Sequence, residues 1–518
     1  MRLDSSFPLC RTLALACAAG MASLACGEAA FPDYNTAPVA PDLRGMERSA
    51  AELAAAVSLG WNMGNTLEAI GGETAWGNPR ITPELIQLVK DSGFDAIRLP
   101  VAWNQYADEA TAAIDPAWLE RIAEVVQLCL DRDLVTIVNI HWDGGWLENN
   151  VTPAAQAAVD ARQRALWEQI ATRLRDFDDR LLFASANEPH VEDAAQMEVL
   201  HTYHQTFVDA VRATGGRNAF RVLVVQGPLT DIERTEALMN RMPVDTVPGR
   251  LMAEVHFYTP YDFTLMDRDQ DWGDMVYYWG DGFHSADDPA RNATWGEEAT
   301  VDDLFTRMKT QFVDQGIPVI LGEYGAMRRS DLPEAQRTPH LAARAHYHET
   351  VTRQANALGL LPFYWDNGGT GHHAFGVFDR DARTVFDPQT LDALRAGAAD
   401  PTHWQQVVTA AGPQSRDTDG DRVPDLLELF LGSDPADPTS MPAPPRARHD
   451  AEDHLVLAFP RAARVEADLR MHLSHDLVTW SELPFHVQTD EATLLELRCD
   501  PLLPGPQTPA FFTLEVAP

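Results

Sequence analysis

Eight short apolar runs constrain the fold of this chain more than any other feature. Each has the length of a strand, is rich in Val, Ile, Leu or Phe, and shows little polar alternation. Strands that are buried on both faces of a parallel sheet have this composition. The runs are Val57–Asn62, Ala96–Val101, Val135–His141, Leu181–Ala186, Arg221–Gln226, Leu251–Phe257, Val319–Gly322 and Leu361–Trp365.

Helical patterns lie between these runs, for example over Thr82–Ser92 and Trp118–Arg132. The first opens with Thr82 as a helix N-cap and Pro83 at the first helical position. Eight strands that alternate with helices predict an α/β fold, a (β/α)8 TIM barrel over residues 45–400. An open doubly wound sheet is the alternative, but the Gly-rich phosphate-binding loop that it requires does not follow the first strand in the expected form.

Six of the eight runs end in polar or aromatic residues. In a TIM barrel the carboxyl ends of the strands share one rim, and that rim carries the chemistry. A polar residue at one strand end usually just begins a loop, but six at the same rim favour an active site. The segments are Arg98-Leu99-Pro100, His141-Trp142-Asp143, Asn187-Glu188-Pro189, His256-Phe257-Tyr258, Glu323-Tyr324-Gly325 and Trp365-Asp366-Asn367.

Glu188 and Glu323, which follow the fourth and seventh runs, suit the cleavage of a glycosidic bond. One carboxyl group protonates the leaving oxygen and the other attacks the anomeric carbon. In enzymes that retain configuration, the two groups lie about 5–5.5 Å apart. We interpret Glu188 as the general acid/base and Glu323 as the nucleophile. Arg98 and Tyr258 are expected to lower the pKa of Glu323, whereas Glu188 must start the reaction protonated.

The other rim residues fit supporting roles. Asn187 is placed to hydrogen-bond the sugar 2-hydroxyl, and Trp365 offers a flat face on which a sugar ring can stack. His141 and His256 suit the orientation of hydroxyl groups or the tuning of the two acids. Taken singly, each residue has an ordinary structural explanation, such as a surface glutamate or a core tryptophan. Their common position on successive strands favours the functional interpretation.

This set of residues resembles the active site of glycoside hydrolase family 5. The family pattern is an Arg, a His, an Asn-Glu pair, a His-x-Tyr, a second Glu and a Trp. The resemblance runs from about Ala51 to Gln389. The matching residues, in chain order, are Arg98, His141, Asn187 with Glu188, His256 with Tyr258, Glu323 and Trp365.

The resemblance implies a retaining enzyme that cleaves internal β-1,4 linkages of a cellulose-type glucan without a catalytic cofactor. A β-mannanase, a xyloglucanase and a mixed-linkage glucanase remain alternatives with the same mechanism. A carbohydrate-binding barrel without activity is disfavoured, because both carboxylates are present. Aldolase or metal-dependent chemistry would need a Schiff-base lysine or a His/Asp cluster at the strand ends, and the sequence offers neither there.

Two further segments resemble the cleft loops of endo-β-1,4-glucanases in this family. The stretches Gly60–Glu68 and Glu73–Pro79 imply that Asn65 and Trp76 line the cleft, and Trp146 is then a wall residue. The long connection from Tyr261 to Thr300 either forms a cap over the sugar subsites or packs as a satellite cluster on the barrel. Its aromatic residues are Trp272, Tyr277, Tyr278, Trp279, Phe283 and Trp295.

An acidic segment over residues 414–440 follows the barrel. It places oxygen ligands at positions 1, 3, 5, 9 and 12 of a loop, the spacing of an EF-hand. Its glycine stands at position 4 instead of 6, and the segment more closely resembles the calcium repeats of thrombospondin type 3. We expect structural Ca²⁺ there, with a solvated acidic linker as the alternative. The ligands would be Asp417, Asp419, Asp421, Asp425 and Glu428.

The chain then continues as a Pro-rich linker over residues 441–448 and a small β-sandwich-like domain over residues 449–518. Short β-type runs in this domain include Leu455–Phe459, Val487–Thr489 and Phe511–Val516. The domain either binds carbohydrate through Trp480 or is only a spacer or attachment module. The sequence leaves both possibilities open.

Charge and the N-terminal segment bear on location and partners. The net charge of −37 disfavours nucleic acid and anionic lipid but is indifferent to a neutral polysaccharide. Residues 1–30 resemble a secretory signal, with lipid attachment at Cys26 as the less favoured alternative. We expect a secreted monomer with no membrane span. Cys129 and Cys499, the two cysteines outside the signal, have no evident disulfide partner.

Overall fold

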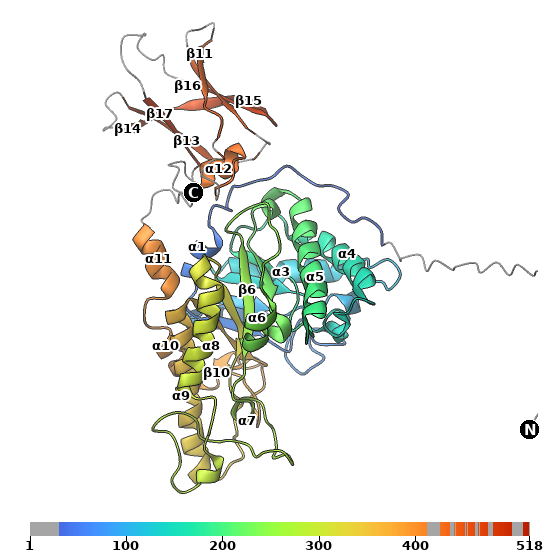
Figure 1. Ribbon diagram of the computed structural model, residues 1–518, viewed down its shortest axis with the longest axis vertical. Coiled ribbons are helices and arrows are strands. Elements are labelled where there is room, and N and C mark those ends of the chain that lie inside the picture. The colour runs from blue at the N-terminus through green and yellow to red at the C-terminus, as the bar shows by residue number, and fades with distance from the viewer. Residues whose placement is uncertain are drawn as a thin grey trace, which may run out of the picture.

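The computed structural model describes residues 31–411, 425–435, 440, 442–450, 452, 454–461, 465, 467–474, 480–499 and 511–516. Eight parallel strands close into a barrel in sequence order, β1 to β8, so the prediction of a TIM barrel is confirmed (Figure 1). The barrel strands are β1 (Gly60–Met63), β2 (Ala96–Leu99), β3 (Val135–Asn139), β4 (Leu181–Ala184), β5 (Leu223–Gln226), β6 (Leu251–Phe257), β7 (Val319–Tyr324) and β8 (Leu360–Asp366).

Helices surround the barrel, and their starts follow local capping chemistry. Thr82 caps α2 by accepting the backbone N–H of Leu85. α3 begins at Pro116, two residues before the predicted start, because Asp115 caps it. The helices are α1 (Ala50–Ala55), α2 (Pro83–Asp91), α3 (Pro116–Leu130), α4 (Gln156–Leu174), α5 (Ala194–Ala213), α6 (Ile232–Leu238), α7 (Tyr261–Thr264), α8 (Glu298–Gln311), α9 (Glu334–Leu358), α10 (Pro388–Gly397), α11 (His403–Ala411) and α12 (Asp425–Leu431). None of the helices within the described ranges is both long and apolar enough to cross a bilayer.

The barrel strands are buried on both faces, as their composition predicts. Large side chains such as Trp61, Trp103 and Trp167 are fully buried in one continuous core. Two charged side chains, those of Arg98 and Glu254, are also completely buried inside the barrel. Since an unpaired buried charge is very unfavourable, both must be held by partners at the active-site end.

Strand β7 is longer than predicted and irregular. It runs through Glu323 and Tyr324, and its pairing with β6 and β8 shifts register near Glu323. A bulge of this kind re-aims a side chain at a barrel rim. The nucleophile candidate therefore lies in the strand itself and not in the loop that follows it.

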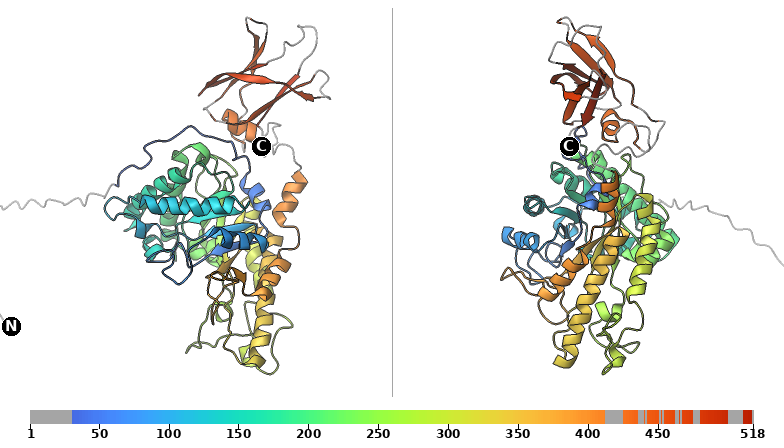
Figure 2. Two further views of the ribbon diagram at one scale, coloured as in Figure 1. Left: turned by 180° about the vertical axis from the view of Figure 1, so that it is seen from behind. Right: turned by 90° about the vertical axis from the view of Figure 1, so that its left-hand side faces the viewer.

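The connection from β6 to α8 extends away from the barrel together with the N-terminal part of α9 (Figures 1 and 2). Tyr277, Tyr278 and Trp279 are buried, and Trp279 packs on Phe263 and Tyr347. Trp272 and Trp295 remain exposed. The inner half of the connection is thus a packed cluster, and only its outer aromatics are free to meet a polymer.

The C-terminal part forms two small antiparallel sheets, as the β-type runs predict. It sits at the end of the barrel opposite to α7 (Figures 1 and 2). Phe430 and Leu431 of α12 join the core of these sheets to Leu43, Met46 and Phe220, which precede barrel strands. The strands are β11 (Arg446–His449), β12 (Leu455–Pro460), β13 (Leu469–Ser474), β14 (Trp480–Glu482), β15 (Phe485–Glu491), β16 (Leu494–Cys499) and β17 (Phe511–Val516), and a hairpin of β9 (Phe378–Asp379) and β10 (Thr384–Val385) lies beside the barrel. The first of these strands, β11, lies mostly within the residues expected to form the linker.

Candidate active site

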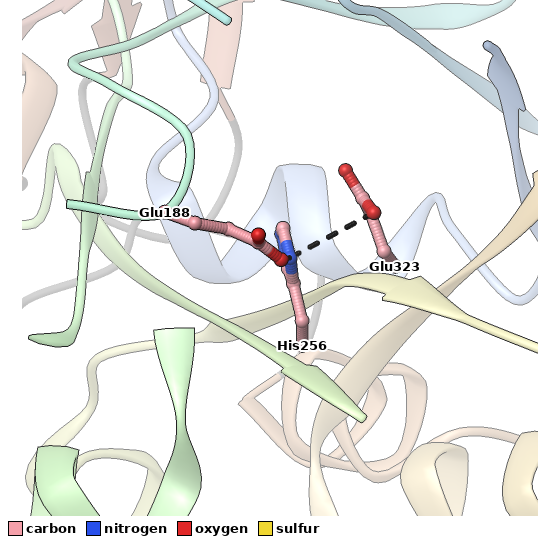
Figure 3. A group of neighbouring side chains, drawn as sticks. All are labelled: Glu188, His256 and Glu323. Carbon is pink, nitrogen blue, oxygen red and sulfur yellow. Dashed lines mark hydrogen bonds and ion pairs between the residues drawn. The ribbon is translucent and has the colours of Figure 1, made fainter. Parts of the chain in front are cut away.

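Glu188 and Glu323 point toward each other on either side of His256 (Figure 3). Glu188 follows β4, His256 lies in β6 and Glu323 lies in β7. One oxygen of each carboxylate and one ring nitrogen of His256 lie within 4.8 Å of one another. This separation suits a covalent, retaining mechanism, because an inverting pair would lie about 6.5–9.5 Å apart to admit a water molecule.

Glu323 is the more enclosed of the two acids. One of its oxygens accepts a hydrogen bond from Nη1 of Arg98 at 3.0 Å, and the other accepts the hydroxyl of Tyr258 at 3.0 Å. Arg98 and Tyr258 lower the pKa of Glu323, as expected, but the net shift is upward. Burial raises the pKa of Glu323, and the lowering by His256, Arg98 and Tyr258 does not fully offset it.

Glu188 is more accessible, with a side chain that is 41% exposed. Its Oε1 lies 2.7 Å from Nδ1 of His256. Its backbone N–H donates to the carboxylate of Glu148 at 2.7 Å. An acid that must deliver a proton to a leaving group and later take one from water needs this access, whereas the nucleophile does not.

His256 is held between two acids. Nε2 lies 3.2 Å from Glu254 and Nδ1 lies 2.7 Å from Glu188. Burial alone would lower the pKa of His256, but Glu323, Glu188 and Glu254 together raise it to about 9. The imidazole is therefore a cation at neutral pH.

Arg98 contacts residues of β1, β6 and β7 and of the loop after β4. Besides Glu323, it donates to Oδ1 of Asn187 at 2.8 Å and to Oδ1 of Asn62 at 3.1 Å. Its Nε forms an ion pair with Glu254 at 3.0 Å. Because the Arg98 contact occupies the oxygen of the Asn187 amide, the NH2 group of Asn187 is the part that can donate to a sugar hydroxyl or to a neighbouring carboxylate.

His141 and Trp365 form a flat wall. Their rings are stacked with centroids 6.0 Å apart and planes 5° apart. Burial, Arg98 and His256 hold the pKa of His141 well below its usual range, so its ring is neutral. A Cβ at Gly64 would lie 2.9 Å from the Trp365 ring, so glycine is needed there for the close approach of this ring.

The other residues predicted to line the cleft, Asn65, Trp76 and Trp146, differ in their exposure to solvent. Asn65 adopts a left-handed conformation, with φ of 57°, and is half-buried. Glu68 fixes this loop, because its carboxylate accepts the backbone N–H groups of Asn65 and Thr66. Trp76 is exposed, as a sugar platform must be. Trp146 packs against the main core instead, so only part of its ring could form a wall.

A pocket opens beside Glu188, between β6 and the loop after β5. Leu229 and Thr230 line it, and both adopt left-handed backbone conformations that non-glycine residues rarely take. His256 and Tyr258 form its opposite side. The pocket adjoins the carboxyl group of Glu188, at the place where a leaving group would be protonated.

Two acids of the site, Glu254 and Glu148, were not predicted from the sequence. Glu254 precedes His256 by two residues in β6 and so points to the same face, and a lone acid within an apolar strand was the available signal. Glu148 lies in a loop, in the short 3-10 helix Glu148–Asn150. Burial raises the pKa of Glu148 to about 7, and it contacts both Glu188 and the side chain of Asn187. Nothing in the sequence around it points to this role.

The predicted calcium ligands Asp417, Asp419 and Asp421 lie outside the described residues, as does the side chain of Asp425. Glu428 is buried in α12, and its Oε1 accepts the hydroxyl of Ser433 at 3.0 Å. A second acidic group, Asp450 with Glu452 and His454, gathers near β12. The guanidinium of Arg498 already lies against both carboxylates of that group, so it provides the cation there.

Sequence comparison identifies relatives over the barrel. Residues 62–371 match the family model for cellulase of glycosyl hydrolase family 5. The chain is 38% identical over 386 residues to a xyloglucan-specific endo-β-1,4-glucanase of Bacteroides ovatus, covering 71% of this chain and 73% of the relative. It is 36% identical over 404 residues to endoglucanase A of Paenibacillus barcinonensis, covering 73% of this chain and 97% of the relative.

Solved structures agree with this relationship. A xyloglucanase of Bacteroides ovatus in complex with an XXXG heptasaccharide is 36% identical, with a TM-score of 0.65, over 71% of this chain and 80% of that one. A broad-specificity endoglucanase of Clostridium acetobutylicum is 26% identical, with a TM-score of 0.58, over 67% of this chain and 99% of that one. Together with the geometry of the two carboxylates, these matches show that the chain belongs to glycoside hydrolase family 5.

Proposed function

We propose that Glu323 is the nucleophile and Glu188 the general acid/base of a retaining enzyme that cleaves internal β-1,4 linkages of a glucan. The observation that carries this proposal is the pair of carboxylates within 4.8 Å, one enclosed by hydrogen-bond donors and the other open to solvent. The unequal surroundings suit unequal roles.

In the first step a Glu323 oxygen attacks the anomeric carbon. The bond from that carbon to the leaving oxygen breaks, and the proton of Glu188 passes to this oxygen. In the second step water attacks the anomeric carbon, gives a proton to Glu188, and releases Glu323 as a carboxylate. Two inversions at the same carbon retain its configuration.

The surroundings of each acid support these steps. Arg98 and Tyr258 hold both oxygens of Glu323, so its reactive orientation is set before the substrate arrives. The leaving part of the polymer would occupy the pocket beside Glu188. Trp365 and His141 offer the wall on which the sugar ring that is being transferred can stack.

A β-1,4-linked glucan backbone fits the relatives best. Among the alternatives with the same mechanism, xyloglucan is favoured, because the relative at 38% identity is xyloglucan-specific and a structural neighbour holds a xyloglucan heptasaccharide. β-mannan and mixed-linkage glucan lack such support among these relatives.

A reducing-sugar assay on xyloglucan, carboxymethyl-cellulose, β-mannan and lichenan tests the proposal. The wild type is expected to act on xyloglucan and carboxymethyl-cellulose. Glu323→Ala and Glu188→Ala are expected to lose activity by about 10²–10⁴-fold or more, with unchanged melting temperatures within a few degrees. Full activity in either well-folded variant would refute the assignment.

We also propose that the acidic segment binds structural Ca²⁺ through Asp417, Asp419, Asp421, Asp425 and Glu428. The spacing of these oxygen ligands supports the proposal. Calcium added to metal-free protein should raise the melting temperature, and Asp419→Asn with Asp421→Asn should abolish that rise. An unchanged melting temperature in the wild type would refute it.

Finally, we propose that residues 1–30 direct secretion and that the enzyme acts as a monomer. The apolar run with flanking arginines supports the first point. N-terminal sequencing of protein from the culture medium and light scattering of the purified enzyme test both points. Retention in the cytoplasm, or a dimer at assay concentrations, would contradict them.

A further inference from the structure

Glu254 is a buried acid that the mechanism above does not use. It lies in β6, and its side chain is completely inaccessible to solvent. One oxygen forms the ion pair with Nε of Arg98 at 3.0 Å, and the other accepts Nε2 of Gln226 at 2.6 Å. Removing a charged group from water lowers the stability of the folded state. A buried acid next to an active site is therefore a candidate for a role in function.

The strand that carries the nucleophile leaves space for this acid. Gly322 immediately precedes Glu323 in β7, and a Cβ at that position would collide with the carboxylate of Glu254. The amide of Asn62 holds the backbone carbonyl of Gly322 at 2.8 Å. The absence of a side chain at Gly322 therefore leaves room for the Glu254 carboxylate beside the strand that carries Glu323.

His256 links Glu254 to both catalytic acids. Nε2 of its ring lies 3.2 Å from Glu254. On the other side of the ring, Nδ1 lies 2.7 Å from Glu188 and 3.9 Å from Glu323, as Figure 3 shows for these three residues. The charges on Glu188 and Glu323 change during the reaction, because one gains and loses a proton and the other becomes an ester. The charge on Glu254 does not change.

We propose that Glu254 is a positioning residue that keeps His256 a cation throughout the catalytic cycle. This inference rests on the proposed roles of Glu188 and Glu323. Before reaction, the negative charge near Nδ1 resides on Glu323. After the glycosyl-enzyme forms, it resides on Glu188. One imidazolium, held by Glu254 on its far side, therefore lies beside the charged carboxylate at both stages.

The groups around His256 agree with this role. Glu188, Glu323 and Glu254 face it from the loop after β4, from β7 and from β6, and His141 in the loop after β3 also interacts with it. Arg98 contacts the same oxygen of Glu254 as His256 does, and the Tyr258 hydroxyl donates to Glu323. Burial raises the pKa of Glu254, but Arg98, His256 and Gln226 outweigh it and lower the pKa below its ordinary value. Glu254 is therefore ionised at neutral pH.

The test is Glu254→Gln, which preserves shape and removes charge, assayed as kcat/KM on xyloglucan from pH 5 to pH 8.5. Burial acts to lower the pKa of His256, and Glu254 is one of three acids that oppose this effect. Without the charge of Glu254 the pKa of His256 should fall, so the imidazolium should be lost at pH 8 before it is lost at pH 5. We expect a loss of at most about threefold at pH 5 and of about tenfold or more at pH 8. A loss of equal size at every pH, or none, would overturn the proposal.

Asp387→Asn is the matched control. Asp387 is also a buried acid paired with a buried arginine, Arg344, at 2.6 Å, but it does not touch His256. This variant should lower stability without changing the shape of the pH profile. A similar change of profile in Asp387→Asn would overturn the proposal, because it would show a general effect of destabilisation.

A measurement on the wild type covers the case in which Glu254→Gln does not fold. The imidazole nitrogens are followed by NMR from pH 5 to pH 10, with His256 identified by the signal lost in His256→Gln. A midpoint near 9 supports the proposal, and a midpoint near 6.5 overturns it. If Glu188→Ala or Glu323→Ala kept activity, the proposed function would fail instead, so the two failures are distinguishable.

Discussion

The two ends of the barrel both bury arginine side chains, but they hold them with different partners. At the active-site end, Arg98 is paired with the carboxylates of Glu254 and Glu323. At the opposite end, Arg250 donates to the backbone carbonyls of Met46, Glu47 and Arg48. The ion pairs of Arg98 place charged groups beside the carboxylates that react. The hydrogen bonds of Arg250 fix the backbone of the segment that precedes α1.

The two kinds of partner leave the pKa of the buried arginine shifted in opposite directions. Burial lowers the pKa of Arg250 to about 10 and that of Arg221, another arginine held by carbonyls, to about 9. Burial also acts to lower the pKa of Arg98, but Glu254 and Glu323 raise it above the ordinary value. The comparison teaches that burial of a charge is not in itself a sign of function, and that the identity of the partner is what separates the two cases.

The largest expected effect on activity comes from Arg98→Met. This change removes the donor to Glu323 and to Asn187 at once, so kcat/KM should fall by about 10²–10³-fold. Steady-state kinetics on xyloglucan measure the loss, and circular dichroism establishes that the variant is folded. Activity within a few fold of the wild type would contradict the proposal that the arginine at the active-site end contributes to catalysis.

Arg250→Met tests the other side of the comparison. It leaves three buried or half-buried carbonyls without their donor, so the free energy of unfolding should fall by about 3 kcal/mol. Denaturant titration measures this loss. The kcat of the folded fraction should be unchanged, and a selective loss of kcat at full folding would show that this end also contributes to catalysis.

The pH profile sharpens the comparison at the active-site end. Glu323 must be ionised to attack, and its pKa is raised above 4.5. Since protonation removes the nucleophile, kcat/KM should fall by about tenfold per pH unit as the pH drops below a midpoint that lies above 4.5. Kinetics after brief exposure to each pH, with activity reassayed at neutral pH, separate this effect from unfolding. A midpoint at or below 4.5 would contradict the raised pKa.

A smaller effect is expected from Trp365→Ala. Loss of an aromatic stacking surface should weaken substrate binding by about 1 kcal/mol, or roughly fivefold in KM, with a smaller change in kcat. Trp272→Ala, in the exposed outer part of the connection after β6, is the comparison variant and should change KM by less. Equal effects of the two substitutions would mean that the polymer also contacts the outer aromatics.

Much of this arrangement could be predicted from the sequence. The eight apolar runs predict a parallel sheet, and the missing Gly-rich phosphate-binding loop after the first run favours the closed barrel over an open doubly wound sheet. The rim position of Glu188 and Glu323 then follows from the fold. Glu254 was missed because an acid inside an apolar run has no partner in the sequence: Arg98 lies 156 positions earlier, in a different strand. Glu148 was missed for the same reason, since its contacts to Asn187 and Glu188 arise only when two loops meet.

The direction of the pKa of Glu323 also could not be predicted. The sequence shows its hydrogen-bond donors, Arg98 and Tyr258, but not how completely the carboxylate is removed from water. In the structure its side chain is 7% exposed, and this loss of solvation outweighs the neighbouring donors. Burial is a property of the whole fold, whereas the identity of a neighbour on a strand can be inferred from strand order.

The central claim, that Glu323 forms a covalent bond with the substrate, can be tested directly by trapping. A 2-deoxy-2-fluoro glucan-type oligosaccharide with a good leaving group slows the second step more than the first, so the glycosyl-enzyme accumulates. Mass spectrometry of proteolytic peptides should then find the sugar on the peptide that contains Glu323, and the label should be absent in Glu323→Gln. A label on any other residue, or turnover of the natural polymer with inversion and no adduct, would contradict the account.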